Sequence, residues 1–111
     1  MSKIPPKAAV RAAQQAIQAL DHPLRQRILV LLYRDRAKLA YGEISKGLGL
    51  PDNSLIAHHL KVLVGAALVG NQLERIGGRI HSLYFISDSG AAWLSKAGLD
   101  APDRVRVLLR T

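Results

Sequence analysis

The chain of 111 residues contains no cysteine, which excludes a disulfide framework and a zinc site built on thiolates. It also has no run of about 18 apolar residues, so no membrane-spanning helix is expected. The opening segment MSKIPPKAAV lacks the apolar core of a signal peptide, and we therefore expect a cytoplasmic protein. Apolar residues make up 49% of the chain, which argues against disorder and allows one domain with a modest core.

Residue patterns for catalysis and metal binding are also missing. The four histidines, His22, His58, His59 and His81, do not pair with each other or with a nearby carboxylate at helical ligand spacing, so no metal site is predicted. The Gly77-Gly78 pair is not followed by the Lys-Ser/Thr helix start of a phosphate-binding loop. No nucleophile or acid/base pair stands out. We therefore predict neither an enzyme nor a cofactor.

The most informative stretch runs from Gly42 to Leu68 and predicts two short helices joined by a tight turn. We expect the second helix to begin at Asp52, whose carboxylate can cap the free N–H groups of the first turn. Ile56, Leu60 and Leu63 then recur at helical spacing and form one apolar stripe. This pattern predicts a helix-turn-helix; the alternative is a pair of amphipathic helices in a small all-α domain.

The face of the second helix opposite that stripe is polar or small and includes one cation. Base edges and phosphates are contacted by such side chains, so this is the predicted DNA-reading surface. Its members are Asn53, Ser54, Ala57, His58 and Lys61.

The net charge of +8 suits a polyanionic partner, either nucleic acid or an anionic membrane surface. The charge is uneven, with a net of +6 in residues 1–40, +1 in residues 41–81 and +1 in residues 82–111. The predicted reading segment is thus nearly neutral. The upstream excess is compatible with phosphate contacts made by helices that flank the reading helix.

Two helices are predicted before this segment. Residues 7–20 form an Ala-rich helix with a narrow apolar stripe, which favours a dimerisation helix over one packed on its own domain. Asp21 is expected to cap the next helix, which runs from Pro23 to about Arg34. Arg25 lies in its first turn, where the helix dipole disfavours a cation, so we predict a phosphate contact; the alternative is a solvated surface arginine.

After the reading helix, Leu68–Ile76 and Arg79–Ile86 are strand-like and predict a hairpin with a primed turn at Gly77 and Gly78. Arg75 and Arg79 flank its tip, which suits a contact to the minor groove or to phosphates. Alternatively, these arginines only keep an exposed tip soluble.

Two further helices complete the prediction. One follows Ser87 and stops at Gly98, and a short last helix ends at Arg110 and should dock on the first helix or on a second subunit. The predicted organisation is an N-terminal arm and dimerisation helix in residues 1–20, a DNA-binding domain in residues 21–97, and a C-terminal helix in residues 98–111 at the dimer interface.

Three segments resemble winged helix-turn-helix transcriptional regulators of the ArsR-like and MarR-like type: LDHPLRQRILVLL from Leu20, HHLKVLVGAALV from His58, and LYFISDSGAAWL from Leu83. Ala67 stands where glycine is usual in that pattern, and the metal-sensing cysteine motif of many ArsR-type repressors is absent. The resemblance implies a mostly α (α+β) fold with a two-stranded wing, and a homodimer formed by the first and last helices. By position it gives the DNA-reading role to the residues of the second helix named above. The wing role falls to Arg75, Gly77, Gly78 and Arg79.

The leading hypothesis is therefore a sequence-specific dimeric regulator that binds double-stranded DNA. One alternative is an architectural or chromatin-like DNA-binding protein that uses charge without base readout. The other is a winged-helix module that binds another protein. Nothing in the sequence marks a site for a small-molecule effector.

Overall fold

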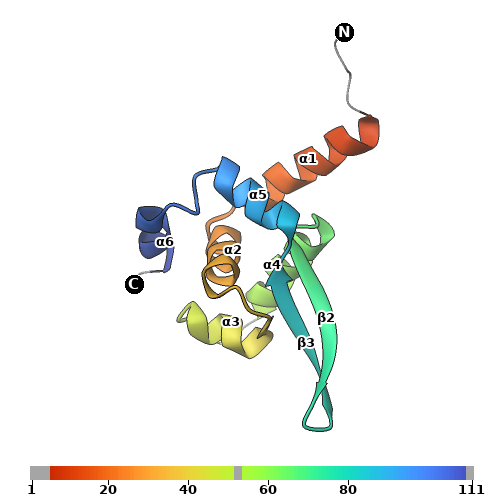
Figure 1. The fold of residues 1–111 in the computed structure, drawn as a ribbon, viewed down its shortest axis with the longest axis vertical. Coiled ribbons are helices and arrows are strands. Elements are labelled where there is room, and N and C mark those ends of the chain that lie inside the picture. The colour runs from red at the N-terminus through yellow and green to blue at the C-terminus, as the bar shows by residue number, and fades with distance from the viewer. Residues whose placement is uncertain (1–5, 52–53, 110–111) are drawn as a thin grey trace.

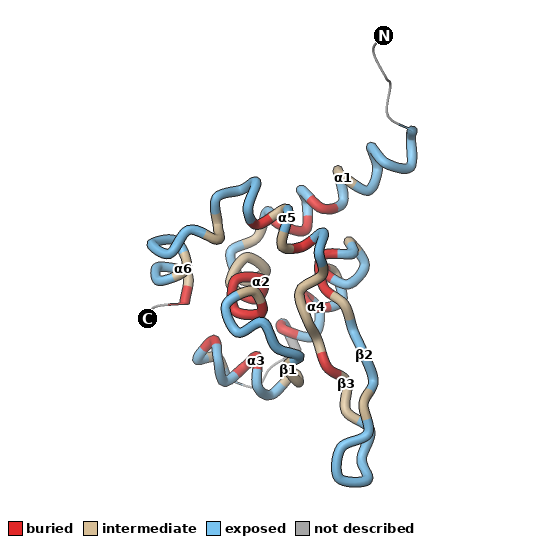
Figure 2. Tube along the Cα trace, in the orientation of Figure 1, coloured by how far each residue is buried: buried red, intermediate tan, exposed pale blue. Residues whose placement is uncertain are grey.

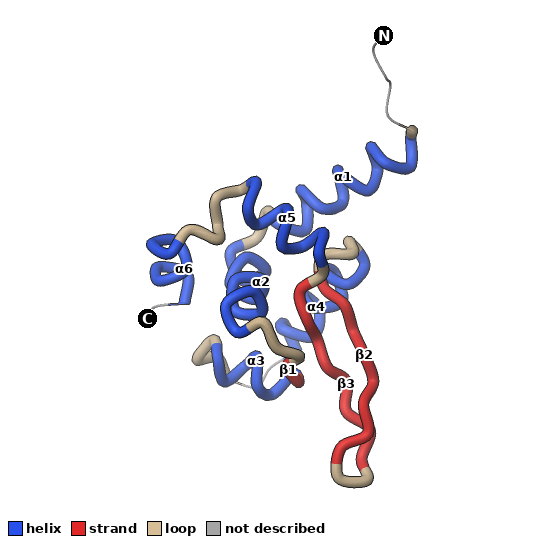
Figure 3. The backbone as a smooth tube through the Cα atoms, in the orientation of Figure 1, coloured by secondary structure: helices blue, strands red, loops and turns tan. Residues whose placement is uncertain are grey.

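The computed structural model describes residues 6–51 and 54–109. Helices dominate, and the strands form one small antiparallel sheet, so the predicted mostly α (α+β) fold is confirmed (Figures 1 and 3). The elements are α1 (Lys7–Leu20), α2 (Pro23–Asp35), β1 (Leu39–Ala40), α3 (Tyr41–Gly47), α4 (Ser54–Gly65), β2 (Val69–Ile76), β3 (Arg79–Ile86), α5 (Asp88–Lys96) and α6 (Pro102–Leu109). In the described ranges, no helix is both long enough and apolar enough to cross a membrane.

The junction between α1 and α2 corrects one prediction. α2 begins at Pro23, as expected, but its N-cap is His22, whose Nδ1 accepts a hydrogen bond of 3.1 Å from the N–H of Leu24. Asp21 instead ends α1, and its N–H donates to carbonyls of the last turn of α1. Proline at the first helical position places the cap one residue before it, so the proline was a better guide than the carboxylate.

The core is centred on α2, whose middle turns are buried on all sides (Figure 2). Residues 28–32 of α2 are buried, and the predicted stripe of α4, Ile56, Leu60 and Leu63, packs into the same cluster. Each fully buried aliphatic side chain contributes about 1.5–3 kcal/mol relative to an exposed one. This cluster therefore fixes which face of α4 remains outside.

The sheet has the strand order β1-β3-β2, with antiparallel pairing throughout. The last pair of the hairpin is Ile76 with Arg79, closed by Gly77 and Gly78 at φ values of 59° and 82°. Positive φ at both central residues is the signature of a type I′ turn, so the predicted primed turn is confirmed. β1 pairs with β3 near the body, and the hairpin extends beyond the helices as the wing (Figure 1).

The end of α4 shows why glycine is usual at the position that Ala67 occupies here. α4 ends at Gly65, close to the predicted stop, and Ala67 follows in the left-handed region with φ 61°. The N–H of Leu68 returns to the carbonyl of Leu63, which closes the helix. Glycine adopts this conformation without strain, whereas alanine does not, so the usual glycine has a structural reason here.

The packing of the last helix within the chain differs from one of its two predicted alternatives, and its contact with a second subunit stays a prediction. α6 packs against α2 of its own chain, with Leu109 buried, rather than on α1. Arg27 of α2 holds it, because its Nε donates to the carbonyl of Leu108 at 2.9 Å and its Nη2 to that of Leu48 at 2.8 Å. One arginine therefore joins the C-terminal helix to the helix-turn-helix.

Candidate nucleic-acid interface

The outer face of α4 forms the first part of the candidate site. Ala57, His58 and Lys61 are exposed, as predicted, because the opposite face of the helix is held in the core. Leu55 is also exposed, at 60%, and was not among the predicted contacts. Ser54 is the first residue of α4. The predicted contact Asn53 and the predicted cap Asp52 lie outside the described residues.

A groove of about 400 Å³ lies between α4 and one face of the sheet. Ala57, Lys61 and Val64 line it from the helix, and Asn71, Ser82 and Tyr84 line it from the strands. Asn71 Nδ2 donates to Ser82 Oγ at 2.7 Å, which orients both polar side chains on this face. The groove joins the reading helix to the wing and presents a cation beside polar groups able to contact a phosphate.

The wing tip, defined as residues 75–80, is the second part of the site. Arg75 pairs across the hairpin with Ile80, and Ile76 pairs with Arg79. Neither arginine makes an ion pair or side-chain hydrogen bond with any residue that the structure describes, and Figure 2 shows the tip exposed on both strands. Two unpaired cations thus stand at the end of a stiff ribbon.

The side chain of Arg25 is bound within the protein, whereas its position in the first turn of α2 suggested a free cation. Its Nε donates to the carbonyl of Ala19 at 2.6 Å, its Nη2 to that of Gln18 at 3.2 Å, and its Nη1 contacts Nδ1 of His59 at 3.1 Å. The guanidinium thereby joins the end of α1 to the reading helix. A phosphate contact by Arg25 stays a prediction, but all three nitrogens already have partners inside the protein.

His59 is the buried partner in this junction, at 7% exposure. Because guanidinium nitrogens only donate, Nδ1 of His59 accepts and its proton resides on Nε2. Burial lowers the pKa of His59 below 6.5, and the nearby charges of His22, Arg25 and His58 lower it further. The side chain is therefore held neutral, as a packing residue, while the neighbouring His58 points outward.

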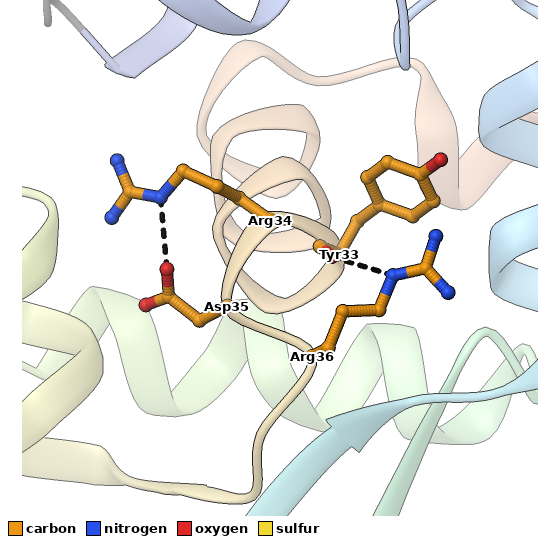
Figure 4. A network of polar contacts seen from close by, with 4 residues as sticks. All are labelled: Tyr33, Arg34, Asp35 and Arg36. Carbon is orange, nitrogen blue, oxygen red and sulfur yellow. Dashed lines mark hydrogen bonds and ion pairs between the residues drawn. The ribbon is translucent and has the colours of Figure 1, made fainter.

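The upstream cations that dominate the charge count are mostly engaged within the protein. At the end of α2, Arg34 Nε binds Asp35 at 2.8 Å, and Arg36 Nε donates to the carbonyl of Tyr33 at 3.1 Å (Figure 4). The guanidinium of Arg36 also lies 4.4 Å from the centre of the Tyr33 ring. Lys38 reaches Glu74 of the wing at 3.4 Å. These contacts hold the donor groups of these cations within the protein, although only Arg34 and Lys38 face a carboxylate.

Sequence reasoning missed Asn71, Ser82 and Tyr84, which line the groove from the sheet. The two-residue turn fixes the hairpin register, so their common face could have been read from the strand alternation. Their approach to Lys61 depends on how the sheet packs on α4, which no local pattern encodes. Across residues 6–51 and 54–109 there is no group of three or more side chains suited to holding a metal ion.

Comparison with known proteins agrees with this architecture. Residues 20–69, just under half of the chain, match the family described as a helix-turn-helix domain. No curated protein matches the sequence. Among solved structures, the diamide-treated YodB from B. subtilis aligns with a TM-score of 0.62 at 17% identity, covering 89% of this chain and 95% of that one.

Two transcriptional regulators are also similar in structure. The PcaV transcriptional regulator from Streptomyces coelicolor, solved with its natural ligand, has a TM-score of 0.60 and 21% identity over 99% of this chain and 84% of its own. The transcriptional repressor BigR from Xylella fastidiosa has a TM-score of 0.56 and 22% identity over 84% of each chain. The resemblance to winged helix-turn-helix regulators of the ArsR-like and MarR-like type is thus confirmed at the level of the fold. The ArsR-like subtype stays a prediction.

Proposed function

We propose that this protein is a sequence-specific DNA-binding transcriptional regulator that acts as a homodimer. α4 enters the major groove, and the wing tip lies on the minor groove or the adjacent backbone. The observation that carries the proposal is the division of the cations. Most upstream arginines are held in intramolecular contacts, whereas Lys61, Arg75 and Arg79 project from the reading helix and the wing.

The proposed dimer uses the surface of α1 that the rest of the chain leaves uncovered. The first half of α1 stands away from the body (Figure 1), and Val10 and Ile17 are exposed on this Ala-rich helix. Val107 of α6 is 75% exposed and offers a further apolar contact. A two-fold pair would bring two reading helices to successive major grooves about 34 Å apart on a pseudo-palindrome.

The same division of charge favours sequence readout over an architectural role. A protein that binds by charge alone needs many free cations along its surface. Here the near-neutral reading helix offers Ala57 and His58 to base edges, with Lys61 as its one cation in the described part of α4. The interface therefore has the composition expected for a few base contacts supported by a few phosphate contacts.

The test is a selection of binding sites from random duplex DNA at about 0.15 M salt, where much non-specific attraction is screened. An enriched inverted repeat with half-sites one helical turn apart supports the proposal. Binding without an enriched motif would assign the architectural role, and no retention of DNA would assign a protein-interaction module.

Variants then separate the parts of the interface. His58→Ala should change the selected sequence, because its imidazole is exposed on the face of α4 that we propose reads base edges. The double variant Arg75→Ala/Arg79→Ala should lower the slope of log affinity against log salt by about 0.9 for each phosphate that the wing no longer neutralises. Arg104→Ala removes an exposed arginine from α6, on a different element, and should leave both properties unchanged.

A further inference from the structure

The wing carries apolar side chains that its packing does not explain. Leu73, Ile76 and Ile80 are exposed at 67%, 53% and 64%, and they lie in the outer half of the hairpin. Isolated exposed aliphatic residues are ordinary on protein surfaces, but these three lie within the outer pairs of a hairpin that extends beyond the helices (Figure 1). Leu73 and Ile80 share one face of the ribbon and Ile76 lies on the other, so both faces of the outer hairpin expose apolar surface.

The strand register distributes these residues in an unusual way. Arg75 lies opposite Ile80, and in the next pair Ile76 lies opposite Arg79. Because successive residues of a strand point to opposite faces, each face of the wing tip presents one isoleucine beside one arginine. A protein-docking patch would be apolar on one face only. Leu73 makes the face of Ile80 the more apolar one, but both faces of the tip carry an isoleucine–arginine pair, which suits a slot whose two walls are alike.

The minor groove of DNA is such a slot. Both of its walls are sugar-phosphate backbones, so each arginine finds a phosphate on its own side, while each isoleucine meets sugars and base edges. The groove is about 6 Å wide in B-DNA, which is too narrow for a ribbon with large side chains on both faces. Entry of the wing tip therefore requires the groove to open.

The wing is built to hold its shape during such an entry. A type I′ turn with two glycines closes the ribbon, and the paired strands run without interruption from Val69–Ile86 to Ile76–Arg79. At the base, β1 adds a third strand, and farther along β2 Lys38 pairs with Glu74 at 3.4 Å. A preorganised ribbon loses little backbone conformational entropy on binding and resists distortion, so the deformation falls on the DNA.

We propose that Ile76 and Ile80 form an apolar wedge that enters the minor groove, partly unstacks a base step and bends the DNA toward the major groove. Arg75 and Arg79 hold the phosphates of the two walls. This inference rests on the proposed function. It adds selection among DNA sequences by how easily they deform, at positions that α4 does not contact. Pyrimidine–purine steps such as TA and CA, which unstack easily, are the sites that the wedge prefers.

The experiment uses the full chain and a duplex that carries the selected site between two fluorophores. Energy transfer measures the approach of the DNA ends, and a separate titration measures affinity. The wild-type protein should bend the duplex by at least about 20°, the lower end of what inserted apolar side chains produce. The variant Ile76→Thr/Ile80→Thr keeps β-branched side chains and both arginines, so it should bind with an unchanged salt slope but lose most of the bend.

The matched control is Leu73→Thr, which removes an equally exposed apolar side chain farther from the turn and should keep the bend. A duplex with a mismatched, already softened step at the wing position should restore the affinity of the double threonine variant to within about twofold of wild type, because the unstacking cost is then largely absent. Failure of the softened duplex to do so would count against the wedge.

Several outcomes overturn the inference, and they are distinct from failure of the proposed function. Specific binding without any approach of the DNA ends refutes the wedge and leaves the regulator intact. If the wild-type protein does not bind DNA at all, both the wedge and the proposed regulator are refuted. Co-sedimentation with vesicles of phosphatidylserine and phosphatidylcholine, abolished by Ile76→Thr/Ile80→Thr, would assign the apolar tip to a membrane surface instead.

Discussion

Replacing Arg25 by alanine is expected to destabilise the folded protein rather than to weaken a phosphate contact. The side chain makes three hydrogen bonds, two to carbonyls of the last turn of α1 and one to His59 of the reading helix. Hydrogen bonds from a charged donor contribute about 1.5–3 kcal/mol each when buried, and less where water competes. Arg25 is only half-buried, so we expect a total loss of about 2–4 kcal/mol.

The assay is urea unfolding followed by far-UV circular dichroism at pH 7.5, where His59 is neutral. A loss of this size is a large part of the 5–15 kcal/mol typical of a domain, so the midpoint should fall clearly. Arg25→Lys should recover little, because one ammonium cannot satisfy three acceptors in the geometry of a guanidinium. Arg11→Ala on the exposed face of α1 is the control and should change stability by less than about 0.5 kcal/mol.

A DNA-binding assay of the same variants tests the alternative, in which Arg25 contacts a phosphate. If Arg25 contacts a phosphate, Arg25→Ala would lower the salt slope of binding by about 0.9 while leaving the unfolding midpoint near that of wild type, and Arg25→Lys would largely restore binding. That combination would refute the structural role. The structural role instead predicts a lowered midpoint with an unchanged slope for the fraction that remains folded.

Three further changes test the packing. Gly90→Ala should cost more than about 2 kcal/mol in urea unfolding, because its Cβ would lie 2.1 Å from the carbonyl oxygen of Leu68, whereas Gly65→Ala meets nothing within 4 Å and should be neutral or stabilising. Ala67→Gly should raise the unfolding free energy by roughly 1 kcal/mol by relieving the φ of 61°, and an unchanged midpoint would contradict this account of the helix end. The free energy of unfolding should fall as the pH drops from about 6.5 toward the pKa of His59 in the folded protein. That pKa is lowered, mainly by burial, so the unfolded chain binds the proton at a higher pH than the folded protein does. His59→Gln should flatten this decline, and an equally steep decline in the variant would show that other groups cause it.

The parts of the fold that local sequence signals determine were predicted well. The bounds of α1 and the hairpin turn matched, because helical periodicity and a Gly-Gly pair act over a few residues. The N-cap of α2 was assigned to Asp21 and belongs to His22, an error of one residue caused by weighing residue type above the position of Pro23. An error of one residue at a helix boundary is small, but it assigns the capping hydrogen bond to the wrong side chain.

The roles of the arginines could not be predicted in the same way. Arg27 donates to the carbonyl of Leu108, 81 residues later, and Arg25 meets His59, 34 residues later. Neither partner is visible in the local pattern, because each depends on how helices pack. The expected docking of α6 on α1 missed its packing on α2, whereas its contact with a second subunit stays a prediction. Predicting a site from charge alone fails for the same reason.

The junction at Arg25 also bears on how the proposed regulator would read an operator. α1 is the proposed dimer helix and α4 the proposed reading helix, and Arg25 and His59 fix the end of one against the middle of the other. In a two-fold pair, the separation of the reading helices depends on the angle between α1 and α4 in each subunit. DNA half-sites are spaced rigidly by the helical repeat, so an error in that angle cannot be absorbed by the DNA without bending. The contacts of Arg25 that fix α4 on α1 and a wing that bends DNA therefore both affect how well the two reading helices of the proposed dimer align with the two half-sites.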